Sequence, residues 1–124
     1  MVENKVEVTT NKDYEELRSM TKFIVNEKIR KFVEDFFDNK VPDYFKHIAA
    51  SSTGKYHPAY TLGDGGLCRH VIAAARILLH ITSLEYLRID SIMRYKMLAA
   101  ILLHDTFKLG IDGSHYTTRD HPQV

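Results

Sequence analysis

Cysteine is nearly absent from this chain, and so is any imbalance of charge. The single cysteine, Cys68, excludes an internal disulfide and is typical of proteins of the reducing cytosol. Seventeen basic residues stand against sixteen acidic ones, so net charge gives no reason to expect a nucleic acid or a membrane surface as partner. A local basic patch is compatible with this balance. Nucleic acid therefore stays a possible partner, although the net charge does not indicate it.

Long hydrophobic runs are also missing. The longest, MLAAILL at 97–103, is far too short to span a bilayer, and the first residues, MVENKVEV, are too polar for a secretory signal. A chain of 124 residues is large enough to bury a core as one domain. We therefore expect a single-domain, cytoplasmic protein that does not bind membranes.

The first half of the chain has the periodicity of helices. Between Asp13 and Asn39 apolar residues recur at intervals of three and four, which predicts either one bent helix or two. VPDYFKHIAA, with Pro42 suited to a first helical turn, predicts a short helix after them. VEVTT at 6–10 is too short for a convincing strand and is expected to be an arm.

A long, glycine-rich segment follows. SSTGKYHPAYTLGDGG, residues 51–66, holds four of the six glycines and one proline, which predicts that regular structure ends here. Sixteen residues is long for a connection, and long ordered loops in compact domains are usually functional or mobile.

Two further helices are predicted after this loop. The first runs from about Gly66 to Thr82, and the second from about Ser91 to His104 with Asp90 as its N-cap. Residues 97–103 are apolar on every side, which is typical of the central helix of a bundle. The fold class expected is therefore all-α, a helical bundle.

Two histidines and an aspartate are candidates for a metal site. His70 lies on the inward face of its helix, while His104 and Asp105 end the apolar helix. If the two helices are antiparallel, the three side chains meet. Imidazole and carboxylate suit a divalent zinc, iron or manganese ion, which would compensate Asp105 for the loss of water. His80 cannot join them, because ten residues of helix span ~15 Å.

Simpler interpretations of the same residues exist. A lone inward histidine is more often a core residue than a ligand. His104 could cap the last carbonyls of its helix, and Asp105 could begin the next turn by bonding its own backbone. Cys68 has no base in evident partnership, so we assign it no catalytic role.

In these residues the chain resembles the HD-domain metal-dependent phosphohydrolase superfamily. The resemblance covers about residues 54–122 and is carried by GGLCRH, then HDTFK, then DHPQV, with KYHPAY upstream. It implies an HD-type helical bundle in which residues 1–53 form an N-terminal helical region and 54–124 the metal-binding core of the same domain. It also implies one or two divalent transition metal ions: manganese, iron, nickel or zinc.

The resemblance further assigns roles to individual residues. It implies that His70, His104 and Asp105 are metal ligands, that His121 is a ligand of a second ion, and that Lys108 faces the phosphate beside the catalytic Asp105. The reaction implied is hydrolysis of a phosphate ester, such as a nucleotide or a nucleic-acid-like substrate. Substrate contacts are expected from Lys55, His57 and Arg69, although a solvated loop would contain the same residues.

The chain departs from the family pattern in two places. Phe107 stands where many members have glycine, and the family's final aspartate ligand comes from a later helix, whereas this sequence stops at Val124. We therefore expect the chain to be either a shortened form of a longer protein or a poor catalyst, with weak metal retention, little turnover, and self-association through apolar surface around Ile101, unless His115 or Asp120 completes the site. Two alternatives stay open: a degenerate HD-fold module that binds a nucleotide or partner without turnover, and a di-iron protein that activates oxygen.

Overall fold

The computed structural model describes residues 12–50, 59–61 and 63–107, and they form an all-α fold. Helix covers residues 12–19, called here the first helix, and three longer elements, α2 (Glu27–Asn39), α3 (Gly66–Thr82) and α4 (Ser91–Leu103). Short 3-10 helices η1 (Met20–Phe23), η2 (Asp43–Lys46), η3 (Ala59–Thr61) and η4 (Glu85–Leu87) connect them. The described residues include no strand, so the predicted all-α class is confirmed, and none of their helices has the length and apolarity needed to cross a membrane.

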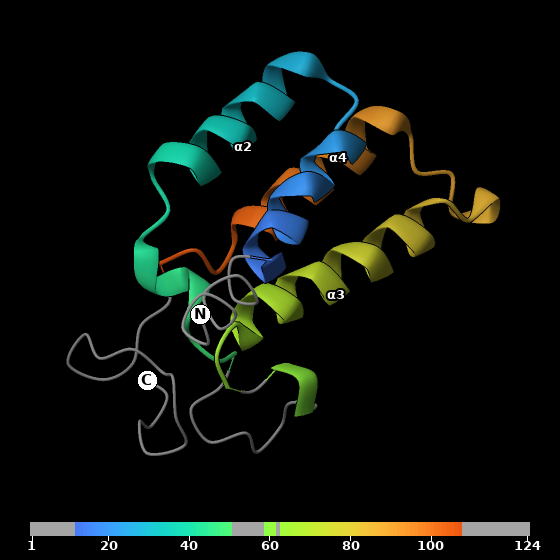
Figure 1. Cartoon of the computed structure of the whole chain (residues 1–124). Helices are drawn as coiled ribbons and strands as arrows, with labels where there is room; N and C mark the ends of the chain where they lie inside the picture. Colours follow the sequence, from blue (N-terminus) through green and yellow to red (C-terminus); the bar gives the residue numbers. More distant parts are fainter. Residues whose placement is uncertain (1–11, 51–58, 62, 108–124) are drawn as a thin grey trace.

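Helices α3 and α4 run antiparallel, and the first helix lies between α2 and α3 (Figure 1). Arg18 of the first helix donates to Asp38 at 2.9 and 3.1 Å and so holds α2. Arg76 of α3 donates to Glu16 on the other side of the first helix. These ion pairs are partly exposed and contribute little stability each, but they fix which helices are neighbours.

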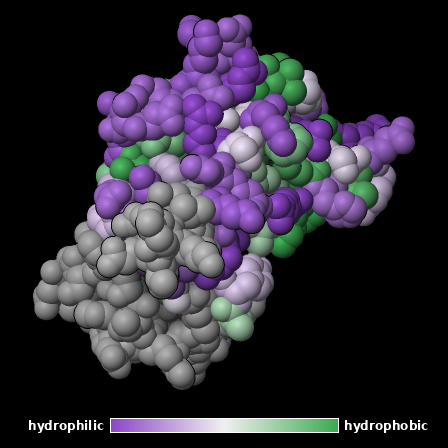
Figure 2. Space-filling view, viewed as in Figure 1, coloured by the Kyte–Doolittle hydropathy of each residue, from purple (hydrophilic) through white to green (hydrophobic). Residues whose placement is uncertain are grey.

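The core lies between these helices and draws on both halves of the chain. Its fully buried members are apolar and come from every helix longer than one turn; among them are Leu17, Val33, Phe45, Leu67, Val71, Leu98 and Leu102. Burial of such side chains is the main favourable term in folding, at about 25 cal/mol per Å². The face in Figure 2 is correspondingly mainly hydrophilic, with hydrophobic side chains in smaller patches.

The region from Asp13 to Asn39 contains two helices. Of the two predicted alternatives, one bent helix or two helices, the second is confirmed. The chain turns extended at Ile24, and Asn26 then begins α2 as its N-cap, since its side chain accepts a hydrogen bond from the backbone of Ile29 at 2.9 Å. The short helix after Pro42 is also present, as the 3-10 helix η2. Pro42 is its N-cap instead of its first residue.

The bounds of α3 agree with the prediction, and α4 ends one residue earlier than expected, with His104 as its C-cap. Asp90 is the N-cap of α4 and accepts from the backbone of Met93 at 2.8 Å, as predicted. The expectation that α4 is the central, most enclosed helix is wrong. Only Leu98 and Leu102 of α4 are fully buried, because its neighbours among the described helices cover one strip of its surface.

The apolar surface expected to be open around Ile101 is also partly covered, because Ile101 is half-buried. Exposed large apolar side chains lie elsewhere on these helices: Ile77 and Ile81 on α3, Ile92 and Met93 on α4. Self-association stays a prediction.

Two glycines make the start of α3 possible. Gly65 has a left-handed backbone, with φ of +78°, which glycine adopts without strain. Gly66 has no such requirement, but a Cβ atom there would lie 2.2 Å from the carbonyl oxygen of Thr61. That oxygen accepts a hydrogen bond from the backbone of Ala50 at 2.9 Å. The close approach of η3 to α3 therefore depends on the absence of a side chain at residue 66.

We predict that Gly66→Ala destabilises the fold by about 3 kcal/mol, because the new methyl group must displace a backbone carbonyl. Urea denaturation followed by circular dichroism measures the change in the free energy of unfolding. Gly63→Ala is the matched control: its Cβ meets open space, and only the left-handed φ of +72° costs energy, about 1 kcal/mol. Equal losses in the two variants would show that crowding at Thr61 is unimportant.

Cys68 is a core residue on α3. It is completely buried, and its thiol lies 3.7 Å from the carbonyl oxygen of Phe45. Burial, together with the negative charge of Asp13, raises the pKa of the Cys68 thiol from 9 to about 12. The thiol therefore stays protonated and unreactive at neutral pH, in agreement with the absence of a catalytic assignment.

We predict that Cys68 resists alkylation by iodoacetamide at pH 8 in the folded protein and reacts readily in urea, which mass spectrometry detects. The raised pKa of the Cys68 thiol also affects the free energy of unfolding. The thiol ionises near pH 9 in the unfolded chain but stays neutral in the folded chain. The stabilisation from the neutral, buried thiol is therefore fully present below pH 9 and is lost as pH rises toward about 12. Rapid alkylation of the folded chain at pH 8 would contradict this burial.

Candidate metal centre

His70 comes from the first half of α3, four residues after Gly66. The backbone bonds of Leu67 to Ile48 and of Ala50 to Thr61 fix this end of the helix, at 2.9 Å each. Leu67 and Val71 on either side of His70 are fully buried, and the His70 side chain itself is about one third exposed. The imidazole thus lies at the edge of the core, as its position on the inward face predicts.

His104 and Asp105 stand at the end of α4, in the turn that follows Leu103. The Nδ1 atom of His104 lies 2.5 Å from the carbonyl oxygen of Ile101. A carbonyl oxygen only accepts hydrogen bonds, so Nδ1 must carry the proton and donate. Nε2 is then the nitrogen with the free lone pair. Fixing the tautomer through one ring nitrogen is how proteins prepare the other to bind a metal.

The next residue, Thr106, holds this turn in place and was not singled out by the sequence analysis. It is buried, and its hydroxyl donates to the carbonyl oxygen of Leu103 at 3.0 Å. Its backbone N–H points to the same oxygen, at 3.3 Å. Asp105, between His104 and Thr106, is therefore held by a capped helix end. A threonine two residues after the predicted helix terminus is a signal for such capping.

The three side chains converge on one point. Oδ2 of Asp105 lies 3.0 Å from Nε2 of His104 and 3.8 Å from Nε2 of His70. One donor atom from each residue lies within 4.8 Å of the other two. Metal–ligand bonds of about 2 Å place two ligand atoms of one ion about 3 to 3.5 Å apart. The two distances from Oδ2 of Asp105 therefore need little adjustment, and the longest distance in the cluster, up to 4.8 Å, requires a small side-chain rotation.

The electrostatics of this cluster suit a cation. Nε2 of His104 and a carboxylate oxygen of Asp105 lie 3.0 Å apart, so a positive ion bound by both atoms would be stabilised by the negative charge of the carboxylate. The capping interpretation of His104 is correct as well, since Nδ1 satisfies a helix carbonyl; the same residue can perform both roles.

The remaining predicted residues do not all join this cluster. His80 is exposed on the second half of α3, as expected. Arg69 donates to the carbonyl oxygens of Tyr60 at 2.6 Å and Asp64 at 3.1 Å, and pairs with Asp13 at 2.7 Å. These contacts tie η3 and the first helix to α3, and a contact between Arg69 and substrate stays a prediction. Lys55, His57, Lys108, His115, Asp120 and His121 lie outside the described residues.

Phe107, which stands where many HD-type proteins have glycine, makes a specific contact. Its ring meets that of Phe36 on α2 edge to face, with 5.9 Å between the centroids, while more than half of its side chain stays exposed. The aromatic pair attaches the residue after Thr106 to a different helix, α2.

Comparison of the chain with protein-family models, with curated proteins and with solved structures found no match. The assignment of the site therefore rests on its own chemistry. Three potential ligands from two antiparallel helices, one of them with a fixed tautomer, form a site whose atoms suit a divalent transition metal ion.

Proposed function

We propose that this chain is a metal-dependent phosphohydrolase that holds a divalent manganese, iron, nickel or zinc ion through His70, His104 and Asp105. The observation that carries the proposal is the position of the Asp105 carboxylate between the Nε2 atoms of two histidines, at 3.0 and 3.8 Å. An ordinary core histidine or a helix cap requires no such convergence of three ligand atoms. Whether a second ion joins the first depends on His121, which the HD resemblance implies as a ligand.

Each residue of the proposed metal site has its own role. His104 presents Nε2 because its Nδ1–H is bound to Ile101, and Asp105 supplies the negative charge that retains a cation. When bound, a divalent ion at such a site lowers the pKa of a coordinated water and stabilises charge on phosphoryl oxygens. Three protein ligands leave coordination positions for water and substrate. The partial exposure of His70 and His104 leaves the site accessible from solvent.

The substrate class follows from the cationic residues of the motifs. Lys108 comes three residues after Asp105, and Lys55 and His57 precede the start of α3 in sequence. We assign them to a phosphate ester, such as a nucleotide or nucleic-acid-like substrate, with Lys108 acting on the transferred charge. We assign the protein to the cytosol in this proposal, because a single free cysteine is typical of proteins of a reducing compartment.

A second candidate is binding without turnover. It is favoured by Phe107, which stands where many HD-type proteins have glycine and which contacts Phe36 of α2. In that case the same three ligands hold an ion, and the chain binds a nucleotide phosphate without cleaving it. The two candidates share the metal site and differ in the rate of hydrolysis.

We predict that the purified protein retains about one equivalent of transition metal after loading, and that His104→Asn removes it. Asparagine is chosen because its side-chain N–H can replace Nδ1–H as the donor to Ile101, whereas no atom replaces the Nε2 ligand. Metal content measured by plasma mass spectrometry should fall at least tenfold in His104→Asn and Asp105→Ala.

His80→Ala, on the exposed second half of the same helix, is the control and should retain the metal. Circular dichroism establishes that each variant is folded. The proposal fails if the wild-type protein binds no metal after reloading with manganese, nickel or iron, or if His80→Ala loses metal as readily as His104→Asn.

We predict that the metal-loaded protein hydrolyses a phosphate ester in a panel of nucleotides and bis(4-nitrophenyl) phosphate. Lys108→Ala should lower kcat by ~10²-fold, the usual effect of one lost charge-stabilising group, with metal content unchanged. Lys96→Ala, an exposed lysine on α4, is the matched control and should leave kcat unaltered. A metal-loaded wild-type protein that binds nucleotide but releases no product would instead support binding without turnover.

A further inference from the structure

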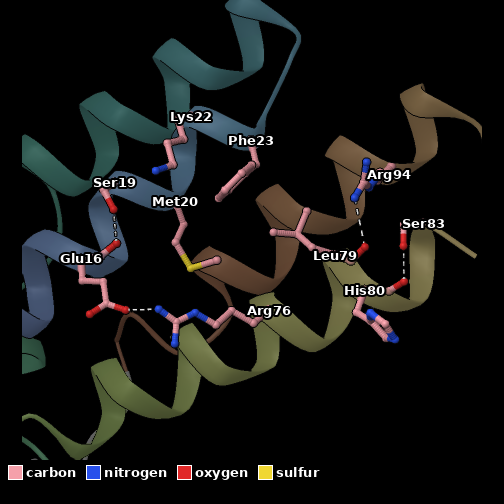
Figure 3. A pocket seen from close by; sticks show the side chains of 10 residues that line it. All are labelled: Glu16, Ser19, Met20, Lys22, Phe23, Arg76, Leu79, His80, Ser83 and Arg94. Carbon is pink, nitrogen blue, oxygen red and sulfur yellow. Dashed lines mark hydrogen bonds and ion pairs between the residues drawn. The ribbon is translucent and has the colours of Figure 1, made fainter.

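A second concave site lies at the other end of the helix pair. It is an open groove of about 610 Å³ between the first helix with η1, the second half of α3, and the beginning of α4 (Figure 3). This volume falls within the range of small-molecule sites in proteins, about 300 to 1,000 Å³. The lining residues come from three separate elements, so the groove exists only in the assembled fold.

The groove carries an excess of positive charge. Its lining includes Lys22, Arg76 and Arg94 but a single carboxylate, Glu16, which pairs with Arg76. Arg94 donates to the carbonyl oxygen of Leu79 at 3.0 Å and to the hydroxyl of Thr82 at 2.9 Å. Both are neutral acceptors, so they orient the guanidinium without neutralising it. A half-buried cation with neutral partners gives a positive potential that an anion can satisfy.

An apolar surface adjoins these cations. Met20 and Phe23 of η1 and Leu79 of α3 point toward one another across the groove (Figure 3). Phe23 is 46% exposed, which leaves part of its ring surface available to a ligand. The ammonium of Lys22 lies 5.2 Å from the centroid of the Phe23 ring, so that a cation and an aromatic surface stand side by side.

The groove and the candidate metal centre are distinct. Leu79 and His80 follow His70 by nine and ten residues, which corresponds to ~15 Å along α3. None of His70, His104 and Asp105 is among the groove's lining residues. A ligand bound in the groove therefore lies too far from the metal site to react there.

We propose that this groove binds a small organic anion with an aromatic body, and that a nucleoside phosphate is the class that fits it. The base would lie on Phe23 and Leu79, and the phosphate would meet Lys22, whose ammonium lies 5.2 Å from the centroid of the Phe23 ring. Arg76 and Arg94 add positive potential from other sides of the groove. Stacking of a base on an aromatic ring and charge-assisted hydrogen bonds from guanidinium and ammonium groups are the usual means of recognising such ligands. The proposal does not depend on the metal site or on its activity.

The test uses the full chain carrying His104→Asn, purified with a chelator, so that a substrate at the metal site cannot contribute. Isothermal titration calorimetry with ATP, AMP, adenosine and inorganic phosphate should give saturable binding of the two nucleotides and much weaker binding of adenosine and phosphate. Lys22→Ala and Phe23→Ala should each weaken nucleotide binding by about tenfold, the effect of ~1.4 kcal/mol. Both side chains are exposed, so these variants should fold.

Lys31→Ala is the matched control, because this lysine is exposed on α2, pairs with Glu27 and does not line the groove. It should leave nucleotide affinity unchanged. Absence of saturable nucleotide binding would overturn the proposal. So would equal binding of adenosine and AMP, since the cations would then be irrelevant, or an equal loss of affinity in Lys31→Ala and Lys22→Ala.

Discussion

The antiparallel packing of α3 against α4 is the contact on which both sites depend. Leu67 and Val71 of α3 and Leu98 and Leu102 of α4 are fully buried members of the core. Near one end of the pair Arg94 of α4 bonds to Leu79 of α3, and at the other end Asp105 approaches His70. A displacement of one helix by a single turn, about 5.4 Å, would separate the ligands beyond the reach of one ion.

This dependence explains why a carboxylate and two imidazoles can stand at the edge of a hydrophobic core. The packing of the leucines supplies the free energy that holds the helices together, and the polar cluster tolerates partial burial because each member keeps access to water or a partner. A cation that binds only the folded chain would add its binding free energy to stability. The site is thus a consequence of the apolar packing and is not what creates it.

The sequence predicted the helices well, because their signals are local. Intervals of three and four residues located α3, and Asp90 marked the start of α4 through a hydrogen bond within four residues. Antiparallel packing of two adjacent helices then brought His70, His104 and Asp105 together as expected. The tautomer of His104 is also a local matter, yet it needed coordinates, because it depends on the distance from Nδ1 to one carbonyl oxygen.

What the sequence could not predict are properties set by distant residues. Arg69 was predicted only as a substrate contact, and its ion pair with Asp13, which is 56 positions away in the chain, was not foreseen. The degree to which α4 is enclosed depends on how many neighbours cover it, and an apolar pattern carries no such information. The groove was missed for the same reason: Lys22, Arg76 and Arg94 share no motif and meet only in the assembled fold.

The two ends of α3 also differ in electrostatic character, which bears on how the sites relate. The cluster at His70 gathers ligand atoms around a carboxylate and attracts a cation, whereas the groove near Leu79 presents cations and attracts an anion. Screening in physiological salt acts over about 8 Å, and the sites are separated by ~15 Å of helix, so direct attraction between their ligands is weak. Any influence of one site on the other must then pass through the packing of α3 against α4, the contact that positions the residues of both.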